Sequence, residues 1–326
     1  MFPQYSPTRD VVPMDQPAVA PRIADSHEDS QATISSLMPY FLANAQYELR
    51  RSPETLLKYC DCMKAVVRAI GDIPPQAIRQ EHILVIKARC AERNAGPCRV
   101  ASIIAALKSF LRFCRFTVGL DTMDPKLIRG VRIPKREVQF LSPEDVQEFV
   151  AAIPIRKSQR VFNMKSLCFR ALVEVLLGTG MRISEALSLK RSSINMQTGE
   201  AAVIGKGNKE RTVFFSPRAL NWVKEYVTRR TDSSDALFIN RWKTPLKRQT
   251  VVQWFSRFRK AAGIKKKVTA HMLRHTVATT LLFNGCPIGH IKEILGHEHL
   301  MTTCKFYLGA DKRAAKDAHQ KYLNYD

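Results

Sequence analysis

The stretch Leu176–Leu189, with the sequence LLGTGMRISEALSL, organises the second half of this chain. An apolar helical pattern over 164–177 leads into it, and two glycines then end that pattern. Arg182 stands where the next helix begins, and Glu185 follows three residues later on the same helical face. A guanidinium held by a carboxylate can bind two phosphate oxygens at once, although such a pair alone is typical of a surface ion pair.

A basic turn follows this stretch. Short β-type runs at 201–204 and 212–215 flank it, which predicts a hairpin. Lys206 lies in the turn between two glycines, where a lysine can reach into a groove and give a proton to a leaving oxygen. Lys209 and Arg211 add two cations, for which we expect contacts with DNA. Taken alone, this turn is typical of a solvated surface.

A predicted helix at 270–284 carries His271 and Arg274 three residues apart, so both project from one side. His271 and His275 also have the i,i+4 spacing of a zinc pair. However, Met272 occupies the position where the metalloprotease pattern has a glutamate, and no third ligand follows nearby. We therefore expect no metal, and we expect His275 to support the fold.

Two further candidates lie near the end of the chain. His297 follows a glycine at the end of a predicted helix, 287–295, and Tyr307 lies in a short predicted helix, 302–308. A tyrosine hydroxyl has an ordinary pKa of about 10, so it needs neighbouring cations to act as a nucleophile. The arginines, lysine and histidines named above are such cations. Phosphoryl transfer depends mainly on positioning and charge stabilisation, so this set predicts phosphodiester chemistry without a metal.

The bulk properties indicate the partner. The chain has 326 residues, a formal net charge of +23 and a pI near 9.9. Such a charge indicates a polyanion. No apolar run reaches the roughly 18 residues that a membrane-spanning helix needs, and no signal-peptide pattern opens the chain. We therefore expect nucleic acid as the partner, no membrane contact, and a cytoplasmic protein.

The eight cysteines form no CxxC pair and lie mostly within apolar helical patterns. This distribution is typical of reduced thiols, so we expect neither disulfides nor a zinc site.

The chain divides into four predicted segments. Residues 1–32 are acidic and rich in proline, which predicts a disordered tail. Residues 33–118 carry apolar helical patterns and form a predicted helical DNA-binding domain. Residues 119–141 contain two prolines and several basic residues, and are expected to be a linker. Residues 142–326 form the predicted catalytic domain with a C-terminal tail.

The predicted fold is mainly α with one small antiparallel β-sheet, arranged as a two-domain clamp around DNA. The last helix of the first domain has a polar face that carries Lys108, Arg112 and Arg115. These side chains are candidate phosphate contacts, although a solvated face would have the same composition.

Four stretches, in this order, resemble the tyrosine recombinase (phage integrase) family, and most of all its Xer-like bacterial branch: LLGTGMRISEALSL, IGKGNKERTV, HMLRHTVATTLL and IKEILGHEHLMTTCKFYL. The likeness is dense over about 142–326. It is weaker over 33–118, which resembles the helical core-binding domain of the family. The first 30 residues have no counterpart in the family pattern.

The resemblance implies a site-specific DNA recombinase that needs neither ATP, cofactor nor metal. Tyr307 would attack the scissile phosphate, forming a 3′-phosphotyrosyl link and freeing a 5′-hydroxyl. Arg182, Arg274 and His297 would stabilise the transition state, and Lys206 would protonate the leaving 5′-oxygen. His271 would transfer a proton or bind the phosphate, and Glu185 would orient Arg182.

The resemblance also implies a homotetramer that binds two double-stranded DNA sites and exchanges strands through a Holliday junction, in the bacterial cytoplasm at the nucleoid. The tail 309–326 would dock on a neighbouring protomer. Two alternatives stay open at this point. A type IB topoisomerase would use similar chemistry to relax supercoils, and a DNA-binding regulator would have lost catalysis.

Overall fold

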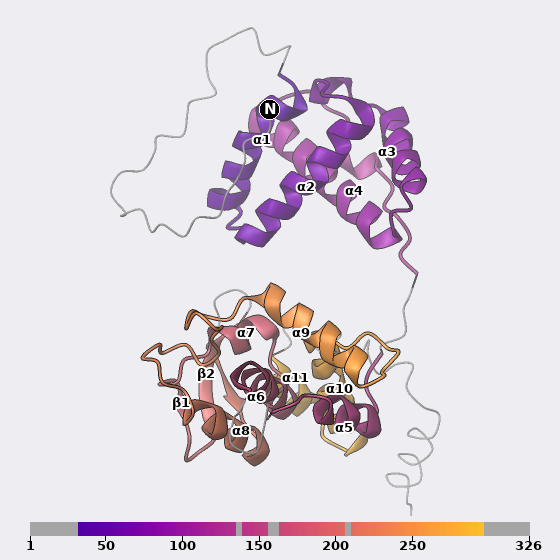
Figure 1. Cartoon of the computed structure of the whole chain (residues 1–326). Coiled ribbons are helices and arrows are strands. Elements are labelled where there is room, and N and C mark those ends of the chain that lie inside the picture. The colour runs from indigo at the N-terminus through magenta and orange to yellow at the C-terminus, as the bar shows by residue number, and fades with distance from the viewer. Residues whose placement is uncertain (1–31, 135–138, 156–162, 206–209, 297–326) are drawn as a thin grey trace, which may run out of the picture. The chain divides into compact units, whose positions relative to one another are not determined.

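The computed structural model describes residues 32–134, 139–155, 163–205 and 210–296. Contacts divide the chain into two units, Met1–Lys135 and Arg136–Asp326, each with its own hydrophobic core (Figure 1). In the part of the chain that the structure describes, no helix is both long and apolar enough to cross a membrane.

All the regular secondary structure that is described in the first unit is helical. Its α-helices are α1 (Ile34–Ala43), α2 (Pro53–Ile70), α3 (Gln80–Glu92) and α4 (Pro97–Phe113). A proline opens both α2 and α4, where its missing N–H costs no hydrogen bond. Helix α2 packs against α1, α3 and α4, and apolar side chains from all four helices meet in one core.

This core extends past residue 118, where the sequence pattern placed its end. Residues Pro125–Leu127 form a 3-10 turn, and Ile128 is buried among the helices. Lys108 Nζ donates to the Ile128 carbonyl at 3.0 Å, and Arg115 Nη1 donates to the Thr122 carbonyl at 2.8 Å. The first part of the expected linker therefore lies on the surface of α4.

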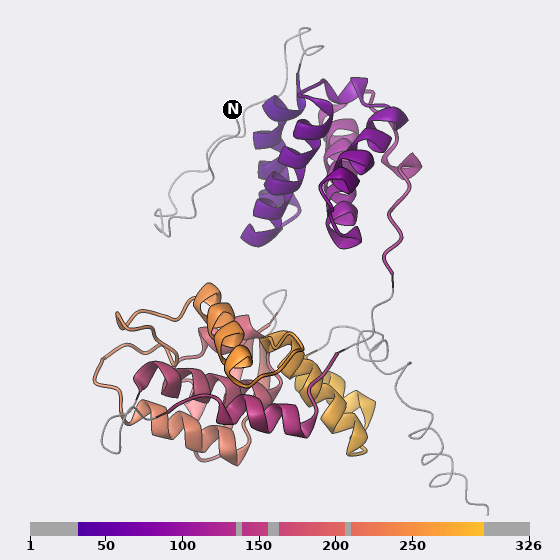
Figure 2. The same ribbon diagram turned by 45° about the vertical axis from the view of Figure 1, so that its right-hand side comes forward.

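The second unit is built around α6 (Met164–Thr179), which is buried along almost its whole length. The helices that cover it include α8 (Pro217–Val227) and α10 (Ala270–Phe283). The other helices of this unit are α5 (Pro143–Ala151), α7 (Ile183–Ser188), α9 (Arg248–Ala261) and α11 (Ile288–Leu295). Figure 2 shows α6 running through this unit, between its neighbours. Ser142 caps α5, accepting a hydrogen bond from the Asp145 amide.

A three-stranded antiparallel sheet lies beside these helices, in the order β1 (Ile194–Asn195), β2 (Glu200–Ile204) and β3 (Glu210–Phe214). Ala202 pairs with Thr212 in the predicted hairpin, which is confirmed. The sequence pattern gave no sign of β1, which is only two residues long. The predicted fold class, mainly α with one small antiparallel sheet, is confirmed within the described residues.

Helices α10 and α11 each lie within one residue of their predicted bounds of 270–284 and 287–295. The predicted helix 302–308 falls outside the described residues.

Candidate active site

Arg182 and Glu185 form an ion pair at the start of α7. The backbone N–H and Nη1 of Arg182 both donate to the Glu185 carboxylate, each at 2.8 Å. Arg182 is therefore the N-cap residue of α7, and the buried Glu185 carboxylate three residues later accepts its backbone N–H. Burial disfavours the charged carboxylate, but the two donations from Arg182 and the charge of Arg211 outweigh it, so the pKa of Glu185 lies below its ordinary value.

The turn that leads into this pair depends on Gly180. Its φ of +63° is left-handed, and it ends α6. A β-carbon at this position would lie 2.6 Å from Cδ2 of Leu295 in α11. Because glycine has no β-carbon, the end of α11 packs directly against the turn, and the Gly180 carbonyl is free to accept Nη1 of Arg274 at 2.9 Å.

Arg274 is almost entirely buried, with 4% of its surface exposed. It sits on α10, whose first turn is capped by the Thr269 hydroxyl. Burial, and then the nearby charge of Arg182, lower the pKa of Arg274 to about 9, so the guanidinium stays protonated at neutral pH. A buried cation with a fixed orientation is suited to stabilise negative charge that develops during a reaction.

Arg211 was expected to contact DNA, but its side chain is only 15% exposed and it points into the protein. From β3, its Nη2 donates to Glu185 at 2.9 Å and its Nη1 donates to the Ile294 carbonyl at 2.7 Å. Its Nε is buried without a hydrogen-bond partner among the described residues. A β-carbon on Gly296 would lie 2.5 Å from this nitrogen, so the close approach requires glycine.

The carbonyls of the last two residues of α11 and of the capping Gly296 each accept a hydrogen bond from a different arginine: Ile294 from Arg211, Leu295 from Arg274 and Gly296 from Arg182. The C-terminal end of a helix carries partial negative charge and unpaired carbonyls. Three cations from β3, α10 and the start of α7 therefore fix this end of α11. The next residue in the chain is His297. We call the three arginines and Glu185 the arginine cluster.

His271 and His275 border the arginine cluster on α10. Their rings meet edge to face, with centroids 4.2 Å apart. Burial and the charges of Arg274 and Arg182 lower the pKa of His271. Burial lowers the pKa of His275 to about 4, with smaller contributions from the charges of His271 and Arg274. His271 remains exposed to solvent, so it can reach a ligand as a neutral imidazole at physiological pH.

The structure thus brings together four of the predicted catalytic and supporting residues: Arg182, Glu185, His271 and Arg274. Arg211, which was predicted only as a DNA contact, joins them. Lys206, Lys209, His297 and Tyr307 lie outside the described residues. Lys108, Arg112 and Arg115 belong to the first unit, and of these Arg112 is exposed on α4.

The role of Arg211 inside the protein was missed, although the sequence carries a signal for it. Arg211, Val213 and Phe215 alternate along and just beyond β3, and the two apolar members are buried. Alternation of period two places Arg211 on the same face. The glycines at 180 and 296 show their function only through the contacts that a side chain there would make.

Among the residues described, no group of three or more His, Cys, Asp or Glu side chains is arranged to hold a metal ion. Seven of the cysteines are described, and all seven are free thiols. Cys98 is exposed, Cys60 and Cys286 are partly exposed, and the other four described cysteines are buried.

Comparison with known proteins places this arrangement in a family. Residues 139–313 match the model of the phage integrase family. The tyrosine recombinase XerA of Pyrococcus furiosus is 34% identical over 223 residues, which cover 67% of this chain and 72% of the relative. The tyrosine recombinase XerD of Halalkalibacterium halodurans is 28% identical over 300 residues, which cover 89% of this chain and 98% of the relative.

Solved structures share the fold. The integrase of the transposon Tn1549, in complex with transposon right end DNA, has a TM-score of 0.71 at 17% identity, covering 88% of this chain and 99% of that one. A lambda integrase dimer bound to a core site has a TM-score of 0.69 at 17% identity, covering 84% and 95%. These relatives are recombinases and integrases by name, so neither the topoisomerase nor the regulator alternative is favoured. The chain belongs to the phage integrase family, and its relatives place it in the Xer-like branch of tyrosine recombinases.

Proposed function

We propose that the protein is a site-specific DNA recombinase that cuts and rejoins DNA through a 3′-phosphotyrosyl intermediate. The observation that carries this proposal is the arginine cluster. Three guanidinium groups from separate elements converge at one end of α11, and the chain continues from there through His297 to Tyr307.

The reaction consists of two phosphoryl transfers that mirror each other. The Tyr307 oxygen forms a bond to the scissile phosphorus as the bond to the 5′-oxygen breaks. The phenolic proton is lost to a base, for which His271 is a candidate, and Lys206 gives a proton to the departing 5′-oxygen. A 5′-hydroxyl from another strand then attacks the phosphotyrosine and releases Tyr307. Bond energy is conserved, so no ATP is consumed.

Arg182 and Arg274 have different parts in this proposal. Arg182 is the more accessible, with 34% of its side chain exposed, and it would bind a non-bridging phosphate oxygen directly. The buried Arg274, together with His297, would add a positive charge of fixed orientation that stabilises the transition state. Negative charge accumulates on the phosphate oxygens in the transition state, and preorganised donors stabilise it because they need no reorganisation.

Arg211 is a positioning residue in this proposal. It cannot reach solvent freely, but it contacts both the carboxylate that orients Arg182 and the helix end that precedes His297. It thereby couples the hairpin that carries Lys206 to the rest of the site.

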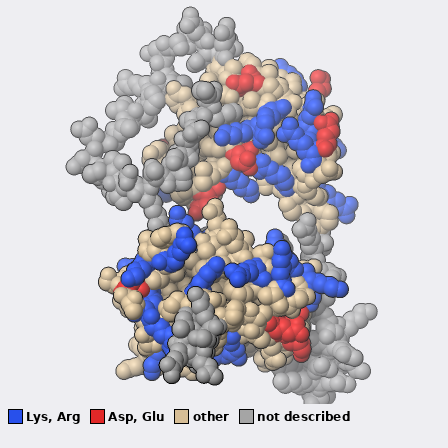
Figure 3. Space-filling view, in the orientation of Figure 1, with Lys and Arg blue, Asp and Glu red and all other residues tan. Residues whose placement is uncertain are grey.

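The partner would be a pair of double-stranded DNA sites, bound by a homotetramer that exchanges strands through a Holliday junction at the nucleoid. The tail 309–326 would dock on a neighbouring protomer. Lysine and arginine side chains gather over the visible faces of both units, which supports a polyanionic partner (Figure 3). Arg112, and with it Lys108 and Arg115, would contact DNA phosphates from the first unit, and Lys209 would do so from the hairpin.

Replacing Arg182 or Arg274 by alanine tests the proposal. Loss of one transition-state donor typically lowers a rate by roughly 10²–10³. We therefore expect a single-turnover cleavage rate reduced at least that far, with duplex affinity changed much less. Arg218→Ala, on the exposed part of α8, is a matched control that should cleave at the wild-type rate. Cleavage that survives both substitutions would overturn the assignment.

A further inference from the structure

The chain enters the second unit along α10, the helix that carries His271 and Arg274. We call residues 140–145 the entry segment, which runs from the end of the expected linker into the first turn of α5. Three contacts join it to α10 and to the loop before α10: Phe140 with Phe283, Leu141 with Thr276, and Asp145 with Lys266. The partners come in reverse order, so the entry segment follows α10 from its last residue back past its first.

The central contact is a buried hydrogen bond. The Leu141 backbone N–H donates to the Thr276 hydroxyl at 3.0 Å, and the same hydroxyl donates to the Met272 carbonyl at 3.0 Å. Because its proton is committed to Met272, the hydroxyl offers Leu141 a lone pair of fixed direction. Leu141 is 2% exposed and Thr276 is 6% exposed. A buried N–H that loses its acceptor is destabilised, so this bond holds the entry segment at one point of α10.

The two outer contacts are more exposed. The rings of Phe140 and Phe283 meet edge to face, with centroids 6.2 Å apart, and solvent reaches both of them. Lys266 Nζ lies 3.0 Å from an oxygen of Asp145, and the same oxygen accepts the Ser142 backbone N–H. Exposed ion pairs contribute little because solvent screens them. The position of the entry segment on α10 therefore depends mainly on Thr276.

The position of α10 decides where two site residues lie. Thr276 follows Arg274 by two residues and His271 by five on this helix. Helix α10 also packs on α6, and Arg274 donates to the Gly180 carbonyl, just before Arg182. A shift of α10 along its axis would thus displace His271 and Arg274 together, relative to an arginine that belongs to α7. Small displacements of reacting groups slow a reaction strongly.

We propose that Thr276 is a positioning residue, whose hydroxyl holds the entry segment and thereby fixes where α10 presents His271 and Arg274 to the scissile phosphate. The proposal rests on the proposed function, because it assigns a further residue to the same site. Thr276 is buried, so it acts through α10 and not by contact with DNA. Its removal should therefore change the rate of the chemical step and leave the affinity for DNA as it is.

The test uses the full chain, with duplex affinity and single-turnover cleavage at saturating DNA measured at a temperature where every variant is folded. Thr276→Val keeps the shape of the side chain but offers Leu141 no acceptor. We expect cleavage to slow roughly tenfold, with an affinity within about twofold of the wild type. Thr276→Ser restores the hydroxyl and should restore the rate. A Thr276→Val protein that cleaves as fast as the wild type, or a Thr276→Ser protein as slow as Thr276→Val, would overturn the proposal.

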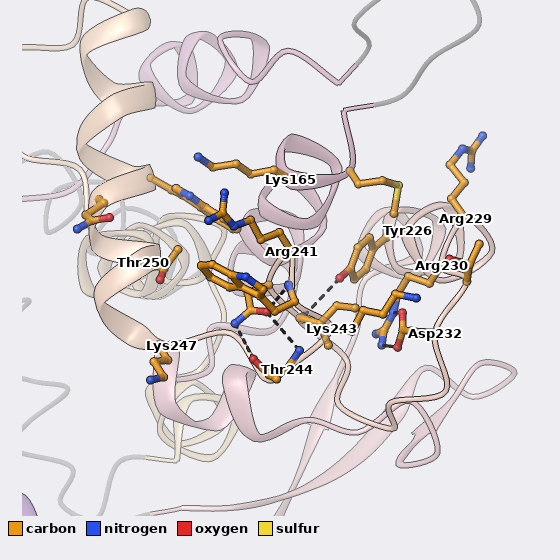
Figure 4. Close-up of a pocket in the computed structure, with 17 residues that line it drawn as sticks. Lys165, Tyr226, Arg229, Arg230, Asp232, Arg241, Lys243, Thr244, Lys247 and Thr250 are labelled. Carbon is orange, nitrogen blue, oxygen red and sulfur yellow. Dashed lines mark hydrogen bonds and ion pairs between the residues drawn. The ribbon is translucent and has the colours of Figure 1, made fainter. Parts of the chain in front are cut away.

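Tyr226→Phe is the matched control. Tyr226 lies on α8 at the cavity between α6, α8 and α9, and it is 1% exposed (Figure 4). Its hydroxyl accepts the Ile239 backbone N–H at 3.4 Å. This variant loses the same kind of buried contact in the same unit, so it should lose stability but cleave at the wild-type rate. Cleavage as slow as that of Thr276→Val would mean that any such loss slows the reaction, and would overturn the positioning role.

Hydrogen exchange separates this proposal from the proposed function, because it requires no cleavage. In Thr276→Val we expect peptides that cover 140–145 and 270–276 to exchange faster than in the wild type, whereas Tyr226→Phe should leave both unchanged. Wild-type exchange of both peptides in Thr276→Val would overturn the proposal, whatever the cleavage activity. Faster exchange in a protein that never cleaves DNA would support the contact and count against the recombinase.

Discussion

At the scale of single residues, the three arginines of the cluster differ mainly in how deeply they are buried. Arg182 is the most exposed, Arg211 is mostly covered and Arg274 is enclosed. All three donate hydrogen bonds to carbonyls at the end of α11, and Arg182 and Arg211 also donate to Glu185. A charge that is held in place by several acceptors costs little reorganisation when a phosphate arrives, which is why we assign direct binding to Arg182 and support to the others.

Arg211→Lys keeps the charge but cannot hold the carboxylate and the Ile294 carbonyl in one planar fork. We expect unfolding to require about 1–3 kcal/mol less free energy, and cleavage at saturating DNA to slow by roughly tenfold. Denaturant titration and single-turnover kinetics measure the two effects. Arg218→Lys is the matched control, since Arg218 pairs with Glu174 away from the site. An Arg211→Lys enzyme that cleaves as fast as this control would refute the positioning role.

His275 predicts how stability depends on pH. Burial and the charges of His271 and Arg274 lower its pKa to about 4, whereas an unfolded histidine titrates near 6.5. Between these values the unfolded chain binds the extra proton, so stability is complete above about pH 6.5 and falls as the pH drops toward 4. Because the His275 ring is only about half buried, solvent screens its charge, and we expect the free energy of unfolding to fall by on the order of 1–2 kcal/mol over this pH range. Melting temperatures of the wild type and His275→Gln should converge at low pH, and parallel curves would contradict the assignment.

At the scale of secondary-structure elements, the site depends on where helices and strands end. Helix α6 ends at Gly180 and α11 ends at Gly296, both with positive φ. The turn and cap signals in the sequence predicted these ends and the hairpin, because glycine and capping residues act locally. The sequence did not predict that three arginines bind the end of α11, since that contact joins segments 21 to 114 residues apart.

Gly296→Ala tests this arrangement. The new β-carbon meets Arg211 at 2.5–2.6 Å and also strains a left-handed backbone. Gly263→Ala provides a control, because Gly263 has a similar φ of +68° with open space around it. We expect Gly263→Ala to cost about 1 kcal/mol and Gly296→Ala about 1–3 kcal/mol more. Equal losses in thermal unfolding would show that the Arg211 contact contributes nothing.

At the scale of the whole molecule, the chain is two units with separate cores. The net charge and the helical patterns predicted two basic domains, because composition and periodicity can be read from the sequence without knowing which residues are in contact. The boundary was harder to predict. Prolines and basic residues after 118 are typical of a linker, yet Ile128 is buried and Lys108 holds the segment that contains it. Only the folded structure shows which apolar residue of such a segment packs into the hydrophobic core.

Separate cores predict separate folding. A fragment of residues 136–326 should unfold in one cooperative transition, which circular dichroism can follow against temperature. It should bind duplex DNA at least tenfold more weakly than the full chain, because it lacks the phosphate contacts that we propose for the first unit. A fragment with no cooperative transition would show that the second unit needs the first in order to fold.

The most direct test of the account is covalent trapping on DNA. Selection from a random duplex library yields the preferred site, and a nick placed beside the cleavage position lets the 5′-hydroxyl fragment diffuse away. We expect the wild-type chain to become attached to the 3′-phosphate end that the break creates, and Tyr307→Phe to form no adduct while it binds the site normally. No adduct with the wild type, or an equal yield with Tyr307→Phe, would contradict the proposed chemistry.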